Sequence, residues 1–486
     1  MRLRNLLPAG GLIALILFMG FYNLGGNLMN DDEGTYLYAS WRVSLGEVPY
    51  RDFFVSQTPL SFYAGAALFK LFSPGVWSAR AACLILIMGT GILIYLTSRR
   101  FFQFSHDLSL AMAGVFLLTK HVYFLGRMFM PDCFVLFFGA AALFFALKAE
   151  TLASKKGQSI PLLLIGLFSG LAALSKLNGV LVFAGYLIYL IYLLIRRIDL
   201  PREVFRKIQV SAAGFLISFG LLYVLMLVFV PGTYHSTLGF HLAKEKIAAS
   251  ALILLPFTRI GQFIGNHNYG LIPAALIGIL FGQAFKERKR VLLLFAAVAS
   301  LLPVLIPGNF FPRYVVFALV PLTFFFGEGI KIIGSQKRLR PWAFPVVLVL
   351  VLLCLGPTFN LKKLAAYDKG TRALVTYVNE QTDEGDYVFG DDPGINFYAR
   401  RPCPPRLVDV SGAMTRSGQI TSADIRSECD RLSVNLILVE KGHSAHHLKN
   451  LLDYQLFQTY LGERYEFLRT AQREFLEVDI YKRRTP

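Results

Sequence analysis

Long apolar segments separated by short polar ones fill most of the chain up to about residue 360. A helix that crosses a bilayer needs about 20 mostly apolar residues, with a range of about 17 to 25. Stretches of this kind occur at 5–26, 78–98, 107–125, 131–147, 158–174, 178–195, 208–230, 267–285, 291–308, 314–330 and 341–359. The pattern therefore predicts an all-α membrane protein with about 11 spanning helices.

Two longer regions lie outside these spans: a loop at 27–77 and the C-terminal segment 358–486. The C-terminal segment has the composition of a soluble domain, whereas the rest of the chain does not. Its patterns predict strands at 387–390, 434–440 and 475–481 and helices near 369–381 and 445–461. We therefore expect a polytopic domain at 1–357 followed by a small α/β domain at 358–486.

The loop at 27–77 predicts two helices that lie along the membrane surface. The first is amphipathic and ends at Gly46. The second runs from Pro59 to Phe72, with proline in its first turn, where the missing N–H is not needed. A connection of this length is more often functional than passive.

The composition supports a membrane protein and excludes several other classes. Apolar residues make up 55% of the chain and charged residues 16%, against about 45–50% and about 25% in soluble domains. The five cysteines lack the spacing of a zinc site or a disulfide scaffold, and a disulfide between Cys403 and Cys429 is left open. The chain has no phosphate-binding loop and no zinc-protease motif, which argues against nucleotide hydrolysis and metalloproteolysis.

The formal net charge of +18 would suggest a nucleic-acid partner in a soluble protein. Most of the excess cations, however, lie in loops on the N-terminal side of the spans, including those at 99–100, 196–207 and 286–290. Cytoplasmic loops of membrane proteins are enriched in Lys and Arg. We therefore expect a multi-pass protein of the inner (cytoplasmic) membrane, with a cytoplasmic N-terminus, an extracytoplasmic C-terminal domain and no nucleic-acid partner.

Three acids, Asp31, Asp32 and Glu33, follow the first predicted span. Carboxylates suit the first turn of a helix because they face the positive end of its dipole. They also suit a general base, which must lie within hydrogen-bond reach of the hydroxyl that it deprotonates. The two interpretations are compatible with each other.

Four more charged residues lie at span ends on the same side of the membrane: Lys176, Arg127, Asp132 and Arg313. Any one cation could simply extend to the lipid headgroups. Ionisable residues at membrane depth are nevertheless costly and mark functional sites. Cations facing a carboxylate cluster suit transfer from a phosphate-activated lipid, because they offset the growing charge of the leaving phosphate.

Three weaker signals remain. His235 and His241 lie in the outer loop at 231–266 and could contact a sugar or a metal ion, although a solvated histidine is the simpler interpretation. The sequence Asp-Asp-Pro-Gly at 391–394 predicts a turn and not a metal-binding pair.

The motifs of interest are 31–36, 46–53, Thr58-Pro59-Leu60, Ala79-Arg80, Ser175-Lys176 with Gly179, and Pro312-Arg313-Tyr314. In this order they resemble the GT-C superfamily of membrane glycosyltransferases. The most similar branch (glycosyltransferase family 39 type) groups dolichyl-phosphate-mannose protein mannosyltransferases with lipid A aminoarabinose transferases. The resemblance covers roughly residues 1–350.

The resemblance implies roles for the acids. Asp32 would be the catalytic base, with Asp31 as the alternative and Glu33 as support. Aminoarabinose transferases carry a Glu-Lys pair before the proline of the second loop helix, where this chain has Gln57-Thr58. This difference favours a generic polyprenyl-phosphate sugar donor over aminoarabinose transfer to lipid A.

The resemblance also implies that Lys176 binds the donor phosphate and that Asp132 is required. We expect Arg127 and Arg313 to assist Lys176.

The predicted activity is inverting transfer of a sugar from a polyprenyl-phosphate donor to an acceptor lipid, glycan or protein on the outer membrane face. The alternative is a transporter or flippase of a lipid-linked sugar. No cofactor is assigned, and the clustered acids leave open whether Mg²⁺ or Mn²⁺ takes part.

Overall fold

The computed structural model describes residues 6–26, 31–152, 154–240, 255–265, 271–305, 310–336, 349, 368–441, 447–473 and 476–484. The chain divides into two compact units, which we describe separately. The helical unit contains Met1–Leu24, Arg80–Val224 and Ile247–Leu364. The mixed unit contains Gly25–Ala79, Leu225–Lys246 and Ala365–Pro486.

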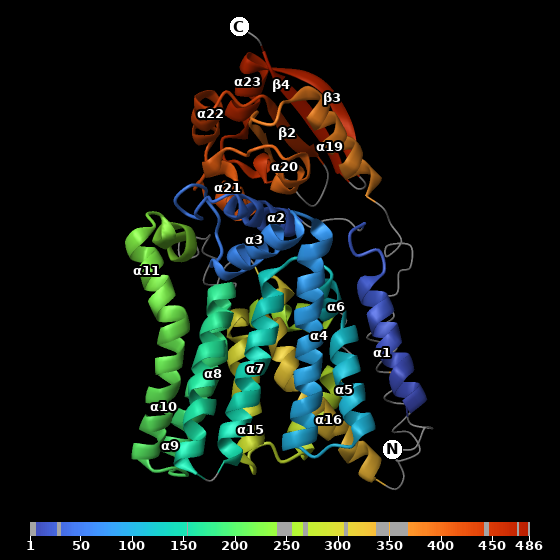
Figure 1. Ribbon diagram of the computed structural model, residues 1–486, viewed down its shortest axis with the longest axis vertical. Coiled ribbons are helices and arrows are strands. Elements are labelled where there is room, and N and C mark those ends of the chain that lie inside the picture. Colours follow the sequence, from blue (N-terminus) through green and yellow to red (C-terminus); the bar gives the residue numbers. More distant parts are fainter. Residues whose placement is uncertain are drawn as a thin grey trace. The chain divides into compact units, whose positions relative to one another are not determined.

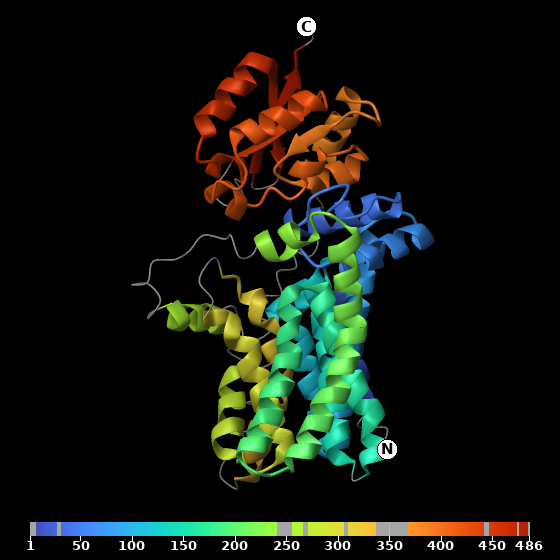
Figure 2. The same ribbon diagram turned by 90° about the vertical axis from the view of Figure 1, so that its left-hand side faces the viewer.

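The helical unit is built from α-helices, some of which continue into short 3-10 or π segments. They are α1 (Leu6–Phe21), α4 (Val76–Phe101, which starts in the mixed unit), α5 (His106–Leu118), α6 (Lys120–Gly126), α7 (Pro131–Thr151), α8 (Lys155–Ser175), α9 (Val180–Ile195), α10 (Pro201–Phe215), α11 (Leu221–Phe229, which ends in the mixed unit), α13 (Leu255–Gly265), α14 (Ile272–Phe281), α15 (Arg288–Leu301) and α16 (Leu319–Ser335). Helices α7, α8 and α10 run side by side (Figure 1 and Figure 2).

Six helices of the described chain are long and apolar enough to cross a membrane, or seven if α5 and α6, bent by 70°, form one span. The six correspond to the spans predicted at 78–98, 131–147, 158–174, 178–195, 208–230 and 314–330. The first predicted span contains the 16-residue α1, and those at 267–285 and 291–308 contain α14 and α15, with 10 and 14 residues. The span predicted at 341–359 lies outside the described residues, apart from Val349.

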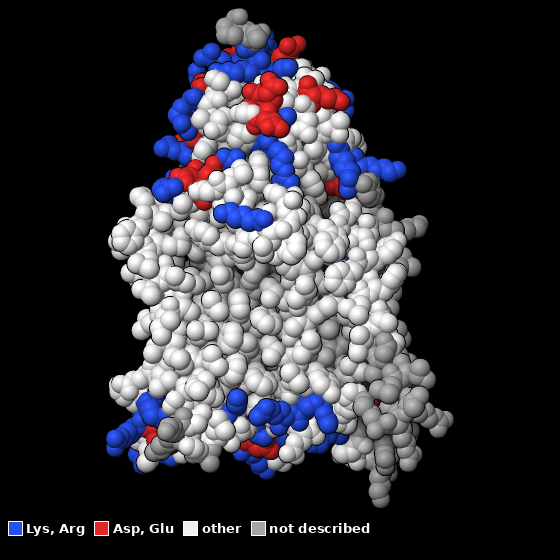
Figure 3. Space-filling view, in the orientation of Figure 1, with Lys and Arg blue, Asp and Glu red and all other residues white. Residues whose placement is uncertain are grey.

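Close backbone packing joins α8 to α10. A Cβ atom at Gly166 would overlap the carbonyl oxygen of Ser211, and one at Gly214 would overlap that of Leu163. Small residues allow such approach where lipid supplies no hydrophobic drive for association. On the face of this unit that Figure 3 shows, the middle of the surface is uncharged, and Lys and Arg, with a few acids, gather at one end of the helices.

The mixed unit contains a four-stranded sheet with the order β1-β2-β4-β3. Strands β1 and β2 are parallel, and the other neighbours are antiparallel. The elements are α2 (Asp31–Ser44), α3 (Leu60–Phe72), α19 (Lys369–Gln381), β1 (Val388–Gly390), α20 (Pro393–Ala399), α21 (Gly412–Arg416), α22 (Ser422–Arg431), β2 (Leu436–Lys441), α23 (Tyr454–Arg464), β3 (Tyr465–Arg473) and β4 (Leu476–Arg483).

Strand β3 was not predicted. It is an edge strand, its register shifts between Phe467 and Arg469, and most of its side chains are exposed. An edge strand with one buried face and a bulge loses the regular alternation by which strands are recognised. The predicted strands at 387–390, 434–440 and 475–481 correspond to β1, β2 and β4.

The contacts divide the chain differently from the boundary predicted between residues 357 and 358, because the first outer loop packs with the C-terminal segment. The amide of Phe54 donates to the carbonyl of Pro405 at 2.8 Å. The hydroxyl of Tyr38 accepts a hydrogen bond from the amide of Cys403 at 2.8 Å. Cys403 and Cys429 are buried free thiols, so the disulfide left open by the sequence does not form in this structure.

A buried cation holds the mixed unit together around Arg473, which is 4% exposed. Its guanidinium donates to Asp392 at 2.6 Å, to Glu440 at 2.7 Å and to the hydroxyl of Thr371 at 3.0 Å. These bonds join β3 to β2, to α19 and to the start of α20. Buried charges require such partners because they have lost their hydration.

We expect Arg473→Met to destabilise the mixed unit by about 3–5 kcal/mol, because two buried carboxylates lose their counter-charge. The measurement is the unfolding midpoint of the full chain in detergent, followed by circular dichroism. Arg426→Met is the matched control, since Arg426 is 52% exposed and pairs with the partly exposed Asp430; its midpoint should not change. Equal shifts in the two variants would contradict this role of Arg473.

Candidate active site

The acidic sequence 31–33 forms the first turn of α2. Glu33 is fully buried, whereas Asp32 is half-buried. The side chain of Asp31 lies outside the described part of the structure. Of the two side chains that are described, Asp32 is therefore the one that a substrate can reach more easily.

The start of α2 lies directly against the start of α20. A Cβ atom at Gly34 would overlap Oδ1 of Asp392 and lie 2.8 Å from the amide nitrogen of Gly394. The same Oδ1 accepts a hydrogen bond from the amide of Gly394 at 2.7 Å and so caps α20. The absence of a side chain at Gly34 thus allows the acidic turn to lie on this cap.

The predicted turn at 391–394 is this helix start, and its first residue also anchors two other segments. Asp391 accepts hydrogen bonds from the amide of Glu440 at 3.0 Å and from the amide of Leu448 at 2.8 Å. It therefore joins the end of β2 to the backbone at Leu448.

Two titratable side chains that no sequence motif marks, Asp409 and His447, feel the negative charge of Asp32. Oδ2 of Asp409 accepts a hydrogen bond from the amide of Ser56 at 2.9 Å. Burial raises the pKa of Asp409, and the negative charge of Asp32 raises it further, while the hydrogen bonds from Ser56 lower it.

Burial lowers the pKa of His447 below its ordinary value. The carboxylates of Asp32, Asp409 and Asp392 act in the opposite direction, and Arg416 adds to the lowering. The imidazole is therefore mostly neutral at neutral pH. No motif marks Asp409 or His447, because most of the chain separates both from Asp32 and only the folded structure lets their charges act on one another.

A separate polar cluster lies within the helical unit. Lys176 follows α8 in an extended conformation, which interrupts the helix at the break predicted from the sequence. Its Nζ donates to both carboxylate oxygens of Asp132, at 2.8 and 2.9 Å, and both side chains are buried. The structure therefore brings together two of the four charged residues predicted at the membrane edge.

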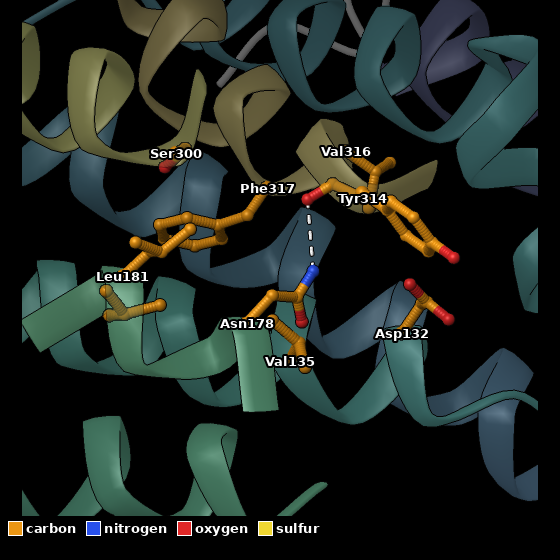
Figure 4. Close-up of a pocket in the computed structure, with 9 residues that line it drawn as sticks. Asp132, Val135, Asn178, Leu181, Ser300, Tyr314, Val316 and Phe317 are labelled. Carbon is orange, nitrogen blue, oxygen red and sulfur yellow. Dashed lines mark hydrogen bonds between the residues drawn. The ribbon is translucent and has the colours of Figure 1, made fainter. Parts of the chain in front are cut away.

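A small cavity of about 10 Å³ adjoins this pair (Figure 4). Asn178 lies on its lining and donates to the carbonyl oxygen of Tyr314 at 3.0 Å. The ring of Tyr314 lies 5.2 Å from Nζ of Lys176, within cation–π range. Asp132 also lines the cavity, which has room for about one water molecule.

Arg127 has a different environment from the one expected. Its guanidinium donates to the carbonyl oxygens of Met19 at 2.6 Å, Gly20 at 2.8 Å and Tyr22 at 2.8 Å. These bonds satisfy carbonyls at the end of α1, which have no partner within that helix. Arg127 therefore binds the helix end, and we leave it out of the proposed phosphate site.

The other expected residues are more scattered. Arg313 is half-buried, is the second residue of the 3-10 helix Pro312–Ala318 and lies over the ring of Phe311. His235 is exposed, and His241 lies outside the described residues. Within the described residues, no group of three or more His, Cys, Asp and Glu side chains is arranged to hold a metal ion.

Residues 52–240 match the family model of the dolichyl-phosphate-mannose-protein mannosyltransferases. The fold is similar to that of ArnT from Cupriavidus metallidurans in the apo state, with a TM-score of 0.68 and 16% identity. It is also similar to ArnT bound to undecaprenyl phosphate, with a TM-score of 0.69 and 15% identity. Both comparisons cover 96% of this chain and 97% of ArnT.

The chain shares the fold of ArnT, a membrane glycosyltransferase of the GT-C type, and part of it matches the mannosyltransferase family model. The archaeal oligosaccharyltransferase AglB from Archaeoglobus fulgidus, solved with an inhibitory peptide and a dolichol-phosphate, is a further structural match. Its TM-score is 0.56 at 13% identity, over 88% of this chain and 69% of AglB. No curated protein matches the sequence. The GT-C resemblance inferred from short motifs is confirmed.

Identities of 13–16% show a shared fold, so the activity and substrates of this chain have to be argued from its own residues. The acidic turn of α2 lies outside the segment that matches the family model, whereas Lys176 and Asp132 lie within it. The roles of the acidic turn, Lys176 and Asp132 are therefore argued from the contacts that these residues make within their own unit.

We expect Gly34→Ala to destabilise the mixed unit by about 1–3 kcal/mol, because the added Cβ pushes α2 away from the cap of α20. The measurements are the unfolding midpoint in detergent and the initial rate of sugar transfer, both of which should fall.

Gly462→Ala is the matched control, since Gly462 lies in α23 with open space around its Cβ position. Alanine is favoured over glycine in a helix, so this variant should keep or raise the midpoint. A Gly34→Ala protein with unchanged midpoint and rate would show that the contact between α2 and α20 is loose.

Proposed function

We propose that this enzyme transfers a sugar, with inversion, from a polyprenyl-phosphate donor to a hydroxyl or amine of an acceptor lipid, glycan or protein. The half-buried carboxylate of Asp32, at the start of α2 in a glycosyltransferase, carries the proposal. The similarity to ArnT bound to undecaprenyl phosphate supports the donor class.

The chemistry needs a base and a way to accommodate the leaving phosphate. The acceptor oxygen or nitrogen forms a bond to the anomeric carbon while the bond from that carbon to the phosphate oxygen breaks. The polyprenyl phosphate leaves with the electron pair, and the carboxylate of Asp32 takes the proton of the acceptor. A base placed in this way contributes typically about 100- to 10,000-fold to the rate.

Asp32 suits this role better than its neighbour. Glu33 is 0% exposed and cannot reach a substrate without moving, so its carboxylate supports the turn of α2. Asp32 retains access from outside while its backbone is fixed by the contact of Gly34 with Asp392. A general base must be open to the substrate and held in a fixed position when the proton moves, and Asp32 meets both conditions.

Lys176 is the proposed ligand of the donor phosphate. Its ammonium group is buried and already paired with the carboxylate of Asp132, so its position is fixed before a phosphate binds. A fixed cation stabilises the growing negative charge of the leaving phosphate without reorganising first.

We propose that transfer occurs on the outer face of the inner membrane. The Lys- and Arg-rich loops at 99–100, 196–207 and 286–290 support a cytoplasmic position for that end of the helices. On this orientation Asp32 and Lys176 both belong to segments that face the outer side.

Asp32→Asn should leave the protein folded and lower kcat by about 100- to 10,000-fold, because the amide cannot accept the proton. The assay offers a panel of undecaprenyl-phosphate hexoses and pentoses together with a membrane extract from a deletion strain. Asp383→Asn, on an exposed loop of the same unit, is the matched control and should keep full activity. Full activity of Asp32→Asn would remove this residue as the base.

Lys176→Gln should weaken binding of undecaprenyl phosphate by about 10- to 100-fold, since a charge-assisted hydrogen bond contributes about 1.5–3 kcal/mol. Binding is measured by calorimetry with the full chain in detergent. The control is Lys207→Gln: Lys207 is also a buried lysine, paired with Glu150 and Asp199 at 2.8 and 2.9 Å.

Both lysine variants break a buried ion pair, so both should lose stability, but Lys207→Gln should retain normal binding. Equal losses of binding in the two variants would assign the effect to stability and not to the phosphate.

Mass spectrometry of lipids and glycans from the deletion strain tests the function as a whole, because one experiment reports the missing sugar and its acceptor. Uptake of the lipid-linked sugar without a new glycosidic bond would support a transporter instead.

A further inference from the structure

We propose that the helical unit binds the phosphate headgroup of an anionic phospholipid in a polar cavity far from Lys176. The cavity has a volume of about 360 Å³, which is within the usual range of ligand sites. Its lining comes from α7, α8, α10, α15 and the turn before α10, and most of it is charged or amide side chains. The proposal goes beyond sugar transfer and does not depend on it.

The cavity lies at the opposite end of α7 from the pair of Lys176 and Asp132. Asp132 is in the first turn of α7, and Glu150, which lines the cavity, is in the last. The 18 residues from one to the other span about 27 Å at about 1.5 Å per residue. The hydrocarbon core of a bilayer is about 30 Å thick. When Asp132 lies at one face of a membrane, the cavity therefore lies at the other, at the depth of the lipid phosphates.

An ion-pair network within the lining gives the cavity a fixed shape. Nζ of Lys207 donates to Glu150 at 2.8 Å and to Asp199 at 2.9 Å, and all three side chains are buried. Nη2 of Arg288 lies 2.7 Å from Asp199, yet the side chain of Arg288 is 44% exposed. A guanidinium has five N–H donors, so Arg288 can bind a phosphate oxygen while it stays paired with Asp199.

A second guanidinium reaches the cavity from α10. Nη2 of Arg206 donates to Oε1 of Gln158 at 2.7 Å, which joins α10 to the start of α8. This bond orients the guanidinium, and an amide, unlike a carboxylate, does not cancel the charge of the group that it binds. Guanidinium groups suit phosphate because their forked donors match its oxygens. Arg206 and Arg288 are therefore the proposed ligands of the headgroup.

Exposed apolar side chains at the same cavity favour a lipid over a free phosphate ion. Ile198 and Leu200 belong to the lining and are 43% and 67% exposed. Phe205, on α10, is 60% exposed. An amphiphile can place its headgroup among the charges and its acyl chain against these side chains, whereas a free phosphate would gain nothing from them.

The charge around the cavity favours an anionic lipid over a zwitterionic one. The segments 196–207 and 286–290 hold nine Lys and Arg and three acids, and Figure 3 shows cations gathered at this end of the helices. Basic segments beside a bilayer attract anionic headgroups, and basic pockets between membrane helices bind them. The ammonium group of phosphatidylethanolamine would be repelled by these cations, so phosphatidylglycerol is the appropriate probe.

The test is the binding of phosphatidylglycerol to the full chain in detergent, measured by native mass spectrometry. The wild type should bind it at least about tenfold more tightly than phosphatidylethanolamine, which has the repelled ammonium group. Arg206→Gln should weaken binding of phosphatidylglycerol by about tenfold, because a charge-assisted hydrogen bond is lost. Arg206→Lys keeps the charge and should retain most of the affinity.

Two controls separate this cavity from other sites. Arg202→Gln makes the same change of charge on the same helix, but Arg202 is exposed and lies outside the lining, so binding should not change. Lys176→Gln should likewise leave binding of phosphatidylglycerol unchanged. Equal losses in Arg202→Gln and Arg206→Gln would show attraction to the surface in general and overturn the proposal. A loss in Lys176→Gln would place the lipid at the other end of the helices.

Inorganic phosphate is the second arm of the test. At millimolar concentration it should leave phosphatidylglycerol bound, because the acyl chain contributes to binding. Displacement of the lipid by inorganic phosphate would overturn the assignment to a lipid, and equal affinities for phosphatidylglycerol and phosphatidylethanolamine would overturn the preference for an anionic headgroup. If Arg206→Lys loses as much affinity as Arg206→Gln, the charge of Arg206 has no part in binding and the proposed ligand is wrong.

Discussion

The mixed unit depends on the burial of Arg473 between two carboxylates. The cation lies 2.6 Å from Asp392 and 2.7 Å from Glu440, and neither carboxylate could remain buried and charged without it. Asp392 in turn caps α20, and Gly34 lies against that cap. The position of the acidic turn of α2 is therefore set by an ion pair formed by residues close to the other end of the chain.

The helical unit also contains a buried ion pair, here among apolar helices. Lys176 and Asp132 neutralise each other where neither could remain charged alone. Their pairing also fixes the direction of the ammonium group, which a lysine at a lipid interface does not have. Arg127 differs, because its guanidinium donates to carbonyl oxygens at the end of α1. The sequence predicted it as a ligand of the donor phosphate, but in the structure it caps a helix.

Some of these features were predictable from the sequence because they depend on neighbours along the chain. Hydropathy predicted six helices that the structure shows at spanning length, and the break at Ser175-Lys176 was visible as an interruption of an apolar run. Helix α19 was predicted with its bounds. The edge strand β3 was not, because its exposed face and its bulge remove the alternating pattern.

The sequence by itself determined that this is a helical membrane protein, where its apolar helices lie, and that three acids follow the first span. Each of these follows from local composition and order. The tertiary structure alone decided which groups surround that turn. Asp409 and His447 carry no motif, and Asp391 and Asp392 looked like an ordinary turn. Burial and charge act through space, so the influence of Asp32 on Asp409 and His447 could be recognised only once distant segments were packed together.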